Sequence, residues 1–242
     1  MKTIVIANFP RFSSEIWLPS LWASAKTYYE LQGEHTADWH WYPCYIDCYD
    51  ANHIDKIKQE LLKANPDVFA ISLYVWNFGL AHEVAAWVKE TFPTCLIVSG
   101  GPHQYLKHDI DWFKKHPYLD ASHSGDCYGE LFFKELLDNY SDGVVDWGAL
   151  TDTKYPLKSR TMSSSTYSMS RTQRKDFAYD YSAFLAQRAE LKEFETFKKI
   201  NFSDSMLLSI IETTRGCPYG CTYCDWGGGI GTTVIQKKYT IS

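Results

Sequence analysis

Short apolar runs alternate with amphipathic stretches over the first 140 residues of the chain. Strand-like runs, rich in β-branched and aromatic side chains, occur at 2–7, 39–45, 67–74, 95–99 and 118–123. Segments with helical spacing of apolar residues occur at 18–31, 53–63, 80–88, 106–115 and 129–137. Strands separated by helices of this length predict βαβ units, so we expect an open, doubly wound α/β fold with a five-stranded parallel sheet.

The carboxyl ends of these strands are the expected place for a ligand. In doubly wound sheets, ligands bind outside the carboxyl ends, where the strand order reverses. The loops that would line such a site are 8–14, 74–78, 100–104 and 123–129. Small residues there would let the backbone approach a large ligand closely, although a glycine after a strand is often only a turn former.

The pattern changes after residue 140. Residues 159–176 are rich in Ser and Thr and contain several Arg, which is typical of an exposed linker. The alternative is that the basic residues at 158–175 contact a phosphate-bearing ligand. A strand-like run at 205–211 then leads into a cysteine-rich segment. We therefore predict a first domain at 1–140, a linker and connecting helix at 141–204, and the start of a second domain at 205–242.

Composition narrows the class of function. The 24 Lys and Arg residues against 29 Asp and Glu residues leave a net charge of −5, which disfavours broad electrostatic binding of nucleic acid. No apolar run approaches the ~20 residues that a membrane span needs, and the first apolar run is too short for a signal peptide. We therefore expect a cytoplasmic protein without a membrane span. Seven cysteines in such a chain favour metal or redox chemistry over a disulfide framework.

Three of the cysteines lie within eight residues. Cys217, Cys221 and Cys224 have the spacing C-x-x-x-C-x-x-C, and Gly216 and Gly220 give the backbone room to turn. Three thiolates this close can converge on one iron–sulfur cluster and leave one iron without a protein ligand. A structural zinc site is the main alternative, but zinc usually takes four Cys or His ligands, and none follows Cys224. Three unrelated core cysteines are a further alternative, which the Gly, Pro and polar neighbours disfavour.

This segment resembles the signature of the radical S-adenosylmethionine (radical SAM) superfamily, C-x-x-x-C-x-aromatic-C, with Tyr223 at the aromatic position. The resemblance implies that Cys217, Cys221 and Cys224 hold a 4Fe-4S cluster. It implies that S-adenosyl-L-methionine (SAM) binds the fourth iron and that Tyr223 lines the SAM site. It also implies cleavage of SAM to a 5′-deoxyadenosyl radical, with electrons from a donor such as flavodoxin or ferredoxin.

The whole chain resembles the cobalamin (vitamin B12)-binding radical SAM class, in which an α/β domain precedes this motif. Segments 66–77, 98–103 and 129–133 resemble the third strand and its loop, the G-G-P-H loop and a Gly-Glu turn of that class. The resemblance implies a cobalamin site at the strand ends. The residues assigned to it are Ser72, Asn77, Gly100, Gly101 and Pro102.

Two departures from cobalamin-binding patterns bear on this site. Loop 8–14 lacks the D-x-H-x-x-G histidine of many cobalamin proteins, so cobalamin would bind without that ligand. The sequence G-D-C-Y-G-E at 125–130 replaces the G-E-G-E of many members of the class. His103 and Cys127 could lie near the ligand edge. Cys44 and Cys48, spaced C-x-x-x-C without a third cysteine, fit core positions better.

The expected function is that of a cobalamin-dependent radical SAM enzyme, such as a methyltransferase acting on an unactivated carbon of a small molecule that the sequence does not identify. One alternative is a radical SAM protein whose first domain docks a substrate or a partner instead of cobalamin. Another is a cobalamin- or cluster-binding module without turnover. Because only 18 residues follow Cys224, we expect a C-terminally truncated chain with the first element of a radical SAM barrel, inactive without the rest of the barrel.

Overall fold

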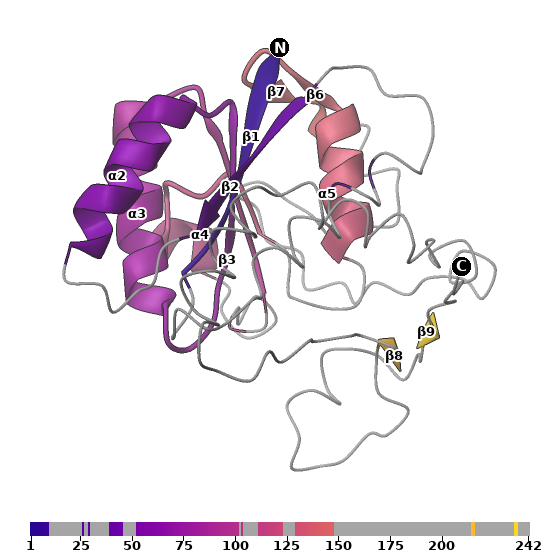
Figure 1. The fold of residues 1–242 in the computed structure, drawn as a ribbon. Helices are drawn as coiled ribbons and strands as arrows, with labels where there is room; N and C mark the ends of the chain where they lie inside the picture. Colours follow the sequence, from indigo (N-terminus) through magenta and orange to yellow (C-terminus); the bar gives the residue numbers. More distant parts are fainter. Residues whose placement is uncertain are drawn as a thin grey trace, which may run out of the picture.

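The computed structural model describes residues 1–9, 26, 29, 39–45, 52–101, 103, 111–122, 129–147, 214–215 and 235–236. The main sheet has the order β2-β1-β3-β4-β5, and all its pairs are parallel. Its strands are β1 (Lys2–Asn8), β2 (Trp39–Tyr45), β3 (Val68–Ser72), β4 (Leu96–Gly100) and β5 (Ala121–Ser122), as Figure 1 shows. The predicted five-stranded α/β fold is confirmed, whereas the predicted strand at 205–211 lies outside the described residues.

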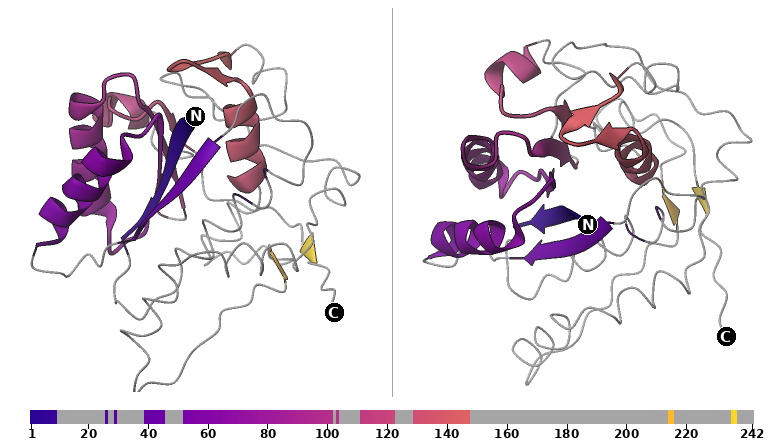
Figure 2. Two further views of the ribbon diagram at one scale, coloured as in Figure 1. Left: turned by 45° about the horizontal axis from the view of Figure 1, so that its top comes forward. Right: turned by 90° about the horizontal axis from the view of Figure 1, so that it is seen from above.

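Helices cover both faces of this sheet. Helices α2 (His53–Ala64) and α3 (Phe78–Thr91) lie on one face, and α5 (Gly129–Asp138) lies on the other (Figures 1 and 2). The sheet is therefore buried on both sides, which explains the nearly continuous apolar runs of its central strands. Of the predicted helix at 18–31 only Lys26 and Tyr29 are described, and both are helical. No helix in the described ranges is long and apolar enough to span a membrane.

Aspartate side chains anchor the amino ends of the strands. The Thr3 N–H donates to Asp67 Oδ2 at 2.7 Å, at the start of β1 and β3. The Ile97 N–H donates to Asp120 Oδ2 at 2.9 Å, and the Lys89 ammonium of α3 lies 2.7 Å from the same oxygen. Each carboxylate thus joins the start of one strand to the segment that leads into its neighbour.

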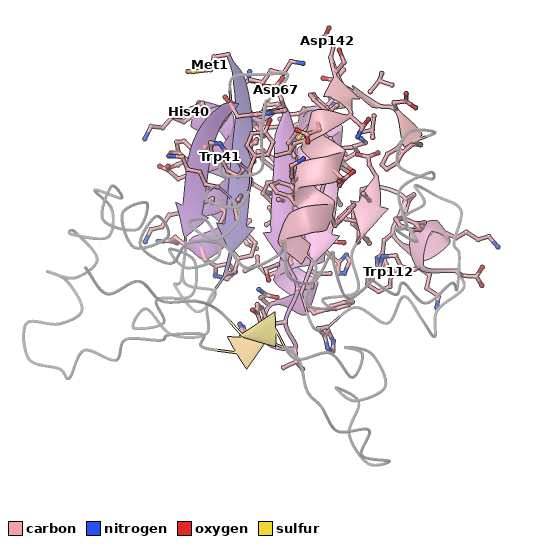
Figure 3. All side chains as sticks on the ribbon, turned by 90° about the vertical axis from the view of Figure 1, so that its right-hand side faces the viewer. Met1, His40, Trp41, Asp67, Trp112 and Asp142 are labelled. Carbon is pink, nitrogen blue, oxygen red and sulfur yellow. The ribbon has the colours of Figure 1, made fainter. Side chains whose placement is uncertain are left out.

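A hairpin that the periodicity does not predict extends the packed region past residue 140. Strands β6 (Tyr140–Ser141) and β7 (Val144–Val145) pair antiparallel around Asp142 and Gly143, whose φ angles are 49° and 85°. Asp-Gly is a strong signal for such a turn. The Lys2 ammonium lies 3.1 Å from the Asp142 carboxylate, which Figure 3 shows at the same end of the sheet as Met1. The proposed domain boundary at 140 falls inside this hairpin and stays a prediction.

A fully buried asparagine, Asn77, organises the opposite, carboxyl end. Its Oδ1 accepts a hydrogen bond from the Tyr74 N–H at 2.8 Å. Its Nδ2 donates to the carbonyls of Phe9 at 3.3 Å and Ser72 at 3.0 Å. Its own carbonyl accepts from the Ala81 N–H at 2.8 Å. One residue therefore joins the segments that leave β1 and β3 to the first turn of α3.

Aromatic and histidine side chains pack between α3 and α4 (Trp112–Lys115). We call this group the imidazole cluster; its members are Phe78, His82, His103, Trp112, His116 and Tyr118. The rings of His82 and His116 stack with centroids 4.1 Å apart. Burial lowers the pKa of His82 to about 4, and the neighbouring charges of His116 and His103 add to the effect. His82 is therefore neutral in the folded protein at neutral pH.

We predict that Asn77→Asp lowers the free energy of unfolding by about 2 to 4 kcal/mol, because a carboxylate keeps the acceptor for Tyr74 but turns oxygen toward two carbonyls in a buried site. Urea unfolding at neutral pH measures the loss. Asn65→Asp makes the same chemical change at an exposed helix end and serves as the control. Equal midpoints for the two variants would contradict the structural role of the Asn77 amide.

We also predict that His82 makes the protein less stable in acid. Between pH 6.5, its ordinary pKa, and about 4, the unfolded chain binds a proton that the folded protein excludes. Stability should therefore fall as the pH drops through this window, by at most about 3 kcal/mol from this residue. His82→Leu should remove that part of the loss in urea unfolding at several pH values, whereas the exposed His40→Gln should not. An unchanged pH dependence in His82→Leu would refute the prediction.

Candidate functional site at the carboxyl edge

The loop after β4 lies directly against the end of β3. The Leu73 N–H donates to the Gly100 carbonyl at 2.7 Å, and the His103 N–H donates to the Leu73 carbonyl at 3.2 Å. Gly101, between these bonds, has a φ of +102°. A Cβ on it would lie 2.5 Å from the Leu73 carbonyl oxygen and 2.8 Å from the Leu73 nitrogen. Glycine is therefore required at 101 by both the backbone conformation and the close approach of β3.

Gly100 differs from its neighbour because open space lies where its side chain would be. Apart from its two chain neighbours, no atom of the described residues lies within 4 Å of a Cβ built on Gly100. The residue is the last of β4, a strand in the middle of the parallel sheet, and it pairs with Ser72 of β3. This opening lies at the edge of the sheet where doubly wound folds bind ligands. The backbone here can accept a large group without a clash from residue 100.

The serines at the strand ends have different surroundings. Ser99 and Ser122 are buried, and their hydroxyl oxygens lie 2.6 Å apart. The Trp112 Nε1–H donates to the Ser122 hydroxyl at 3.1 Å, so this network is internal to the fold. Ser72 is half-buried, and its hydroxyl lies beside Gly101. Of these three serines, Ser72 is therefore the best placed to contact a ligand.

Two aromatic side chains on the loop after β3 stack on each other. The rings of Tyr74 and Trp76 have centroids 4.5 Å apart and are nearly parallel, at 10°. The Trp76 Nε1 atom is buried and has no hydrogen-bond partner in the described part of the chain. Val75, between them, is 71% exposed. Neither aromatic residue is among those assigned from the sequence, although two aromatics spaced i, i+2 directly after a strand were an available signal.

The residues assigned to cobalamin from the sequence fall into three groups. Ser72, Gly100 and Gly101 lie together at the junction of β3 and β4. Asn77 is near them, but its side-chain amide is buried and bonded to backbone groups, so its contribution is to the shape of the loop. Pro102 lies outside the described residues.

The predicted cluster and SAM ligands, Cys217, Cys221, Cys224 and Tyr223, lie outside the described residues, and so do Cys48 and Cys127. Two residues before Cys217, Thr214–Arg215 forms β8, which pairs with β9 (Ile235–Gln236). This pair lies on the side of the main sheet where the strands end (Figures 1 and 3).

The cysteines that the structure describes have no features of a reactive or metal-binding site. Cys44 and Cys95 are free and buried, and burial raises the pKa of each thiol to about 12. The expected core position of Cys44 is confirmed. No group of three or more His, Cys, Asp or Glu side chains within the described ranges could hold a metal ion.

Comparison with known proteins relates the chain to larger enzymes. It is 32% identical over 170 residues to the cobalamin-dependent radical SAM methyltransferase TokK of Streptomyces tokunonensis, matching 70% of this chain and 23% of TokK. It is 34% identical over 176 residues to the 2-(S-pantetheinyl)-carbapenam-3-carboxylate methyltransferase of Streptantibioticus cattleyicolor, matching 67% of this chain and 22% of that enzyme. The chain thus spans less than a quarter of each of these relatives. No protein-family model matches it.

A solved structure supports the fold. The cobalamin-dependent SAM radical enzyme OxsB with aqua-cobalamin bound aligns over 98% of this chain and 30% of its own, with a TM-score of 0.53 and 16% sequence identity. At this identity the match concerns the architecture alone. Together with the sequence relatives, it agrees with the five-stranded sheet observed here. By sequence, the chain is a relative of the cobalamin-dependent radical SAM methyltransferases.

Proposed function

We propose that this chain supplies the cobalamin-binding domain and the cluster-binding segment of a cobalamin-dependent radical SAM methyltransferase. Cobalamin would lie across the carboxyl edge at Ser72, Gly100, Gly101 and Pro102. SAM and a 4Fe-4S cluster would lie beside it, held by the cysteine segment. The observation that carries the proposal is the open space at Gly100, at the strand ends of a fold shared with cobalamin-dependent relatives.

The residues at this edge fit a large, flat ligand. Gly101 brings the β4 loop into contact with β3, and Gly100 leaves space above the junction. The Ser72 hydroxyl is half-buried and lies beside Gly101. The stacked rings of Tyr74 and Trp76, on the loop after β3, add an apolar surface at the same end of the sheet. Loop 8–14 after β1 has no histidine, so cobalamin would bind without a ligand from that loop.

The donor set of the cysteine segment fits an iron–sulfur cluster. Cys217, Cys221 and Cys224 would be the ligands, because three thiolates leave one iron open to the amine and carboxylate of SAM. Tyr223 would line the SAM site. Bound together, these groups supply reductive cleavage of SAM and a transferable methyl group. The position of β8 on the ligand side of the sheet supports an arrangement in which the two sites face each other.

The remaining parts of the proposal concern the larger protein. We propose a small-molecule substrate with an unactivated carbon as methyl acceptor, and flavodoxin or ferredoxin as electron donor. Turnover would require the rest of the radical SAM barrel, and the proposed location is the cytoplasm. Anaerobic reconstitution of the chain with iron, sulfide and hydroxocobalamin, followed by gel filtration and absorbance, tests it. Iron and corrin should co-elute with the protein; iron without corrin would favour a docking role for the first domain, and corrin without iron would refute the enzyme assignment.

We predict that alanine at either of the two adjacent glycines weakens corrin binding, but that only one of the two substitutions lowers stability. Gly100→Ala should fold with unchanged stability but bind hydroxocobalamin at least about tenfold more weakly, because its methyl group occupies the ligand space. Gly101→Ala should lose both stability and binding, because its Cβ meets Leu73. Urea unfolding and equilibrium binding separate the two effects.

Two further glycines provide controls. Gly79→Ala adds a methyl group with no atom within 4 Å on helix α3, and Gly143→Ala strains a residue with φ 85° in the distant hairpin. Neither should weaken corrin binding. Unchanged binding in Gly100→Ala would remove the main support for a corrin at this edge.

We predict that Cys217→Ala, Cys221→Ala and Cys224→Ala each abolish the visible absorbance and protein-bound iron of the reconstituted chain, because three thiolates are the minimum local ligand set. Cys127→Ala and Cys44→Ala are matched controls and should retain both. Iron binding that survives in any of the first three variants would show that the ligand assignment is wrong.

A further inference from the structure

The imidazole cluster lies directly behind the loop that carries the proposed ligand site. The centroid of the Phe78 ring lies 4.3 Å from that of His82 and 4.9 Å from that of His103. His103 is the residue whose N–H bonds to the Leu73 carbonyl, and Leu73 in turn bonds to Gly100. The packing of His82 is therefore two contacts away from the backbone at the carboxyl edge.

One hydroxyl group joins the two stacked histidines of the cluster. The Tyr118 hydroxyl oxygen lies 2.7 Å from His82 Nδ1 and 2.9 Å from His116 Nδ1. Burial raises the pKa of Tyr118 to about 12, so the hydroxyl keeps its proton at neutral pH. With one proton it can donate to only one Nδ1 and must accept an N–H from the other. The two Nδ1 atoms therefore hold one proton between them.

The far nitrogen of His82 decides which histidine carries that proton. His82 is 8% exposed, and its Nε2 is buried without a hydrogen-bond partner in the described part of the chain. An orphaned N–H is rarer in buried sites than an orphaned acceptor. The favoured arrangement leaves the lone pair on His82 Nε2. His82 Nδ1–H then donates to Tyr118, and Tyr118 donates to His116 Nδ1.

A second proton cannot be accommodated in this arrangement. Protonation of His116 at Nδ1 removes the acceptor of the Tyr118 hydroxyl proton. The hydroxyl could then donate only to His82, which would have to move its own proton to the buried Nε2. A charged His116 would also face the His82 ring at 4.1 Å. Among the described residues, the titratable groups that face His82 are His116 after α4, His103 in the β4 loop and Tyr118 before β5, and the first two repel an added positive charge.

We propose that His82, His116 and Tyr118 form a one-proton clasp that positions the loop containing Gly100, Gly101 and His103, and that uptake of a second proton releases this loop. The three are positioning residues, since they act on the ligand edge through Phe78 and His103. The consequence for corrin binding rests on the proposed function, whereas the effect on the loop does not.

The test is amide hydrogen exchange of the full chain, followed by NMR at about pH 7.5, 6 and 5, a range that spans histidine titration. The readouts are the protection factors of the Leu73 and His103 amides, corrected for the intrinsic exchange rate. In the wild type, both should fall by about tenfold across this range, while the Asp67 amide at the opposite end keeps its protection. Constant protection of Leu73 and His103 would overturn the clasp.

Three variants separate a clasp from ordinary packing. His116→Gln keeps a hydrogen-bonding side chain that does not titrate, so protection should match the wild type near pH 7.5 and remain there in acid. Tyr118→Phe keeps the ring but removes the bridge, so protection should already be low near neutral pH. In His40→Gln, on the exposed edge strand, amide protection should fall in acid as much as it does in the wild type. The proposal would be refuted if amide protection in His116→Gln still fell in acid, or if it were already lower than in the wild type near neutral pH.

Hydroxocobalamin binding, measured on the same samples, distinguishes the two proposals. Weaker binding in acid for the wild type but not for His116→Gln would support both. A pH step in exchange without corrin binding at any pH would support the clasp and overturn the cobalamin site. Corrin binding without a pH-dependent fall in amide protection would support the cobalamin site and overturn the clasp.

Discussion

The buried amide of Asn77 satisfies backbone groups that would otherwise be unpaired where the chain turns at the carboxyl edge. It accepts from Tyr74 and donates to Phe9 and Ser72, so the segments that leave β1 and β3 are held in one geometry. Water cannot replace these bonds, because the residue is fully buried. The stacked aromatics, the start of α3 and the adjacent β4 loop all depend on this arrangement.

Two adjacent glycines give the edge its shape for opposite reasons. At Gly101 the missing side chain lets Leu73 approach, and the space is already filled by backbone. At Gly100 the missing side chain leaves space that no other residue in the described part of the chain fills. The same residue type thus closes the strand junction at one position and keeps it open at the next. The sequence Gly-Gly alone does not say which glycine closes the strand junction and which one leaves space there.

Periodicity predicted the strands and helices well because burial between two helical layers controls their composition. The predicted strand at 39–45 matches β2, and Pro43 lies in an edge strand, where its missing N–H is tolerated. The hairpin at Asp142-Gly143 was missed because its strands are only two residues long. The pairing of His82 with Tyr118, 36 residues apart, depends on which helix ends meet, and no local pattern encodes that. The cysteine motif is the reverse case, since its resemblance to the radical SAM signature lies within eight consecutive residues and implies a ligand set without any tertiary contact.

The two ends of the sheet differ in how their strands are fastened. At the amino end, Asp67 and Asp120 tie strand starts together with charged side chains, and Lys89 adds an ion pair. At the carboxyl end, neutral amides and hydroxyls hold the loops. Strand register is therefore anchored by charged groups at the amino end, whereas loop geometry at the carboxyl end rests on hydrogen bonds between uncharged groups.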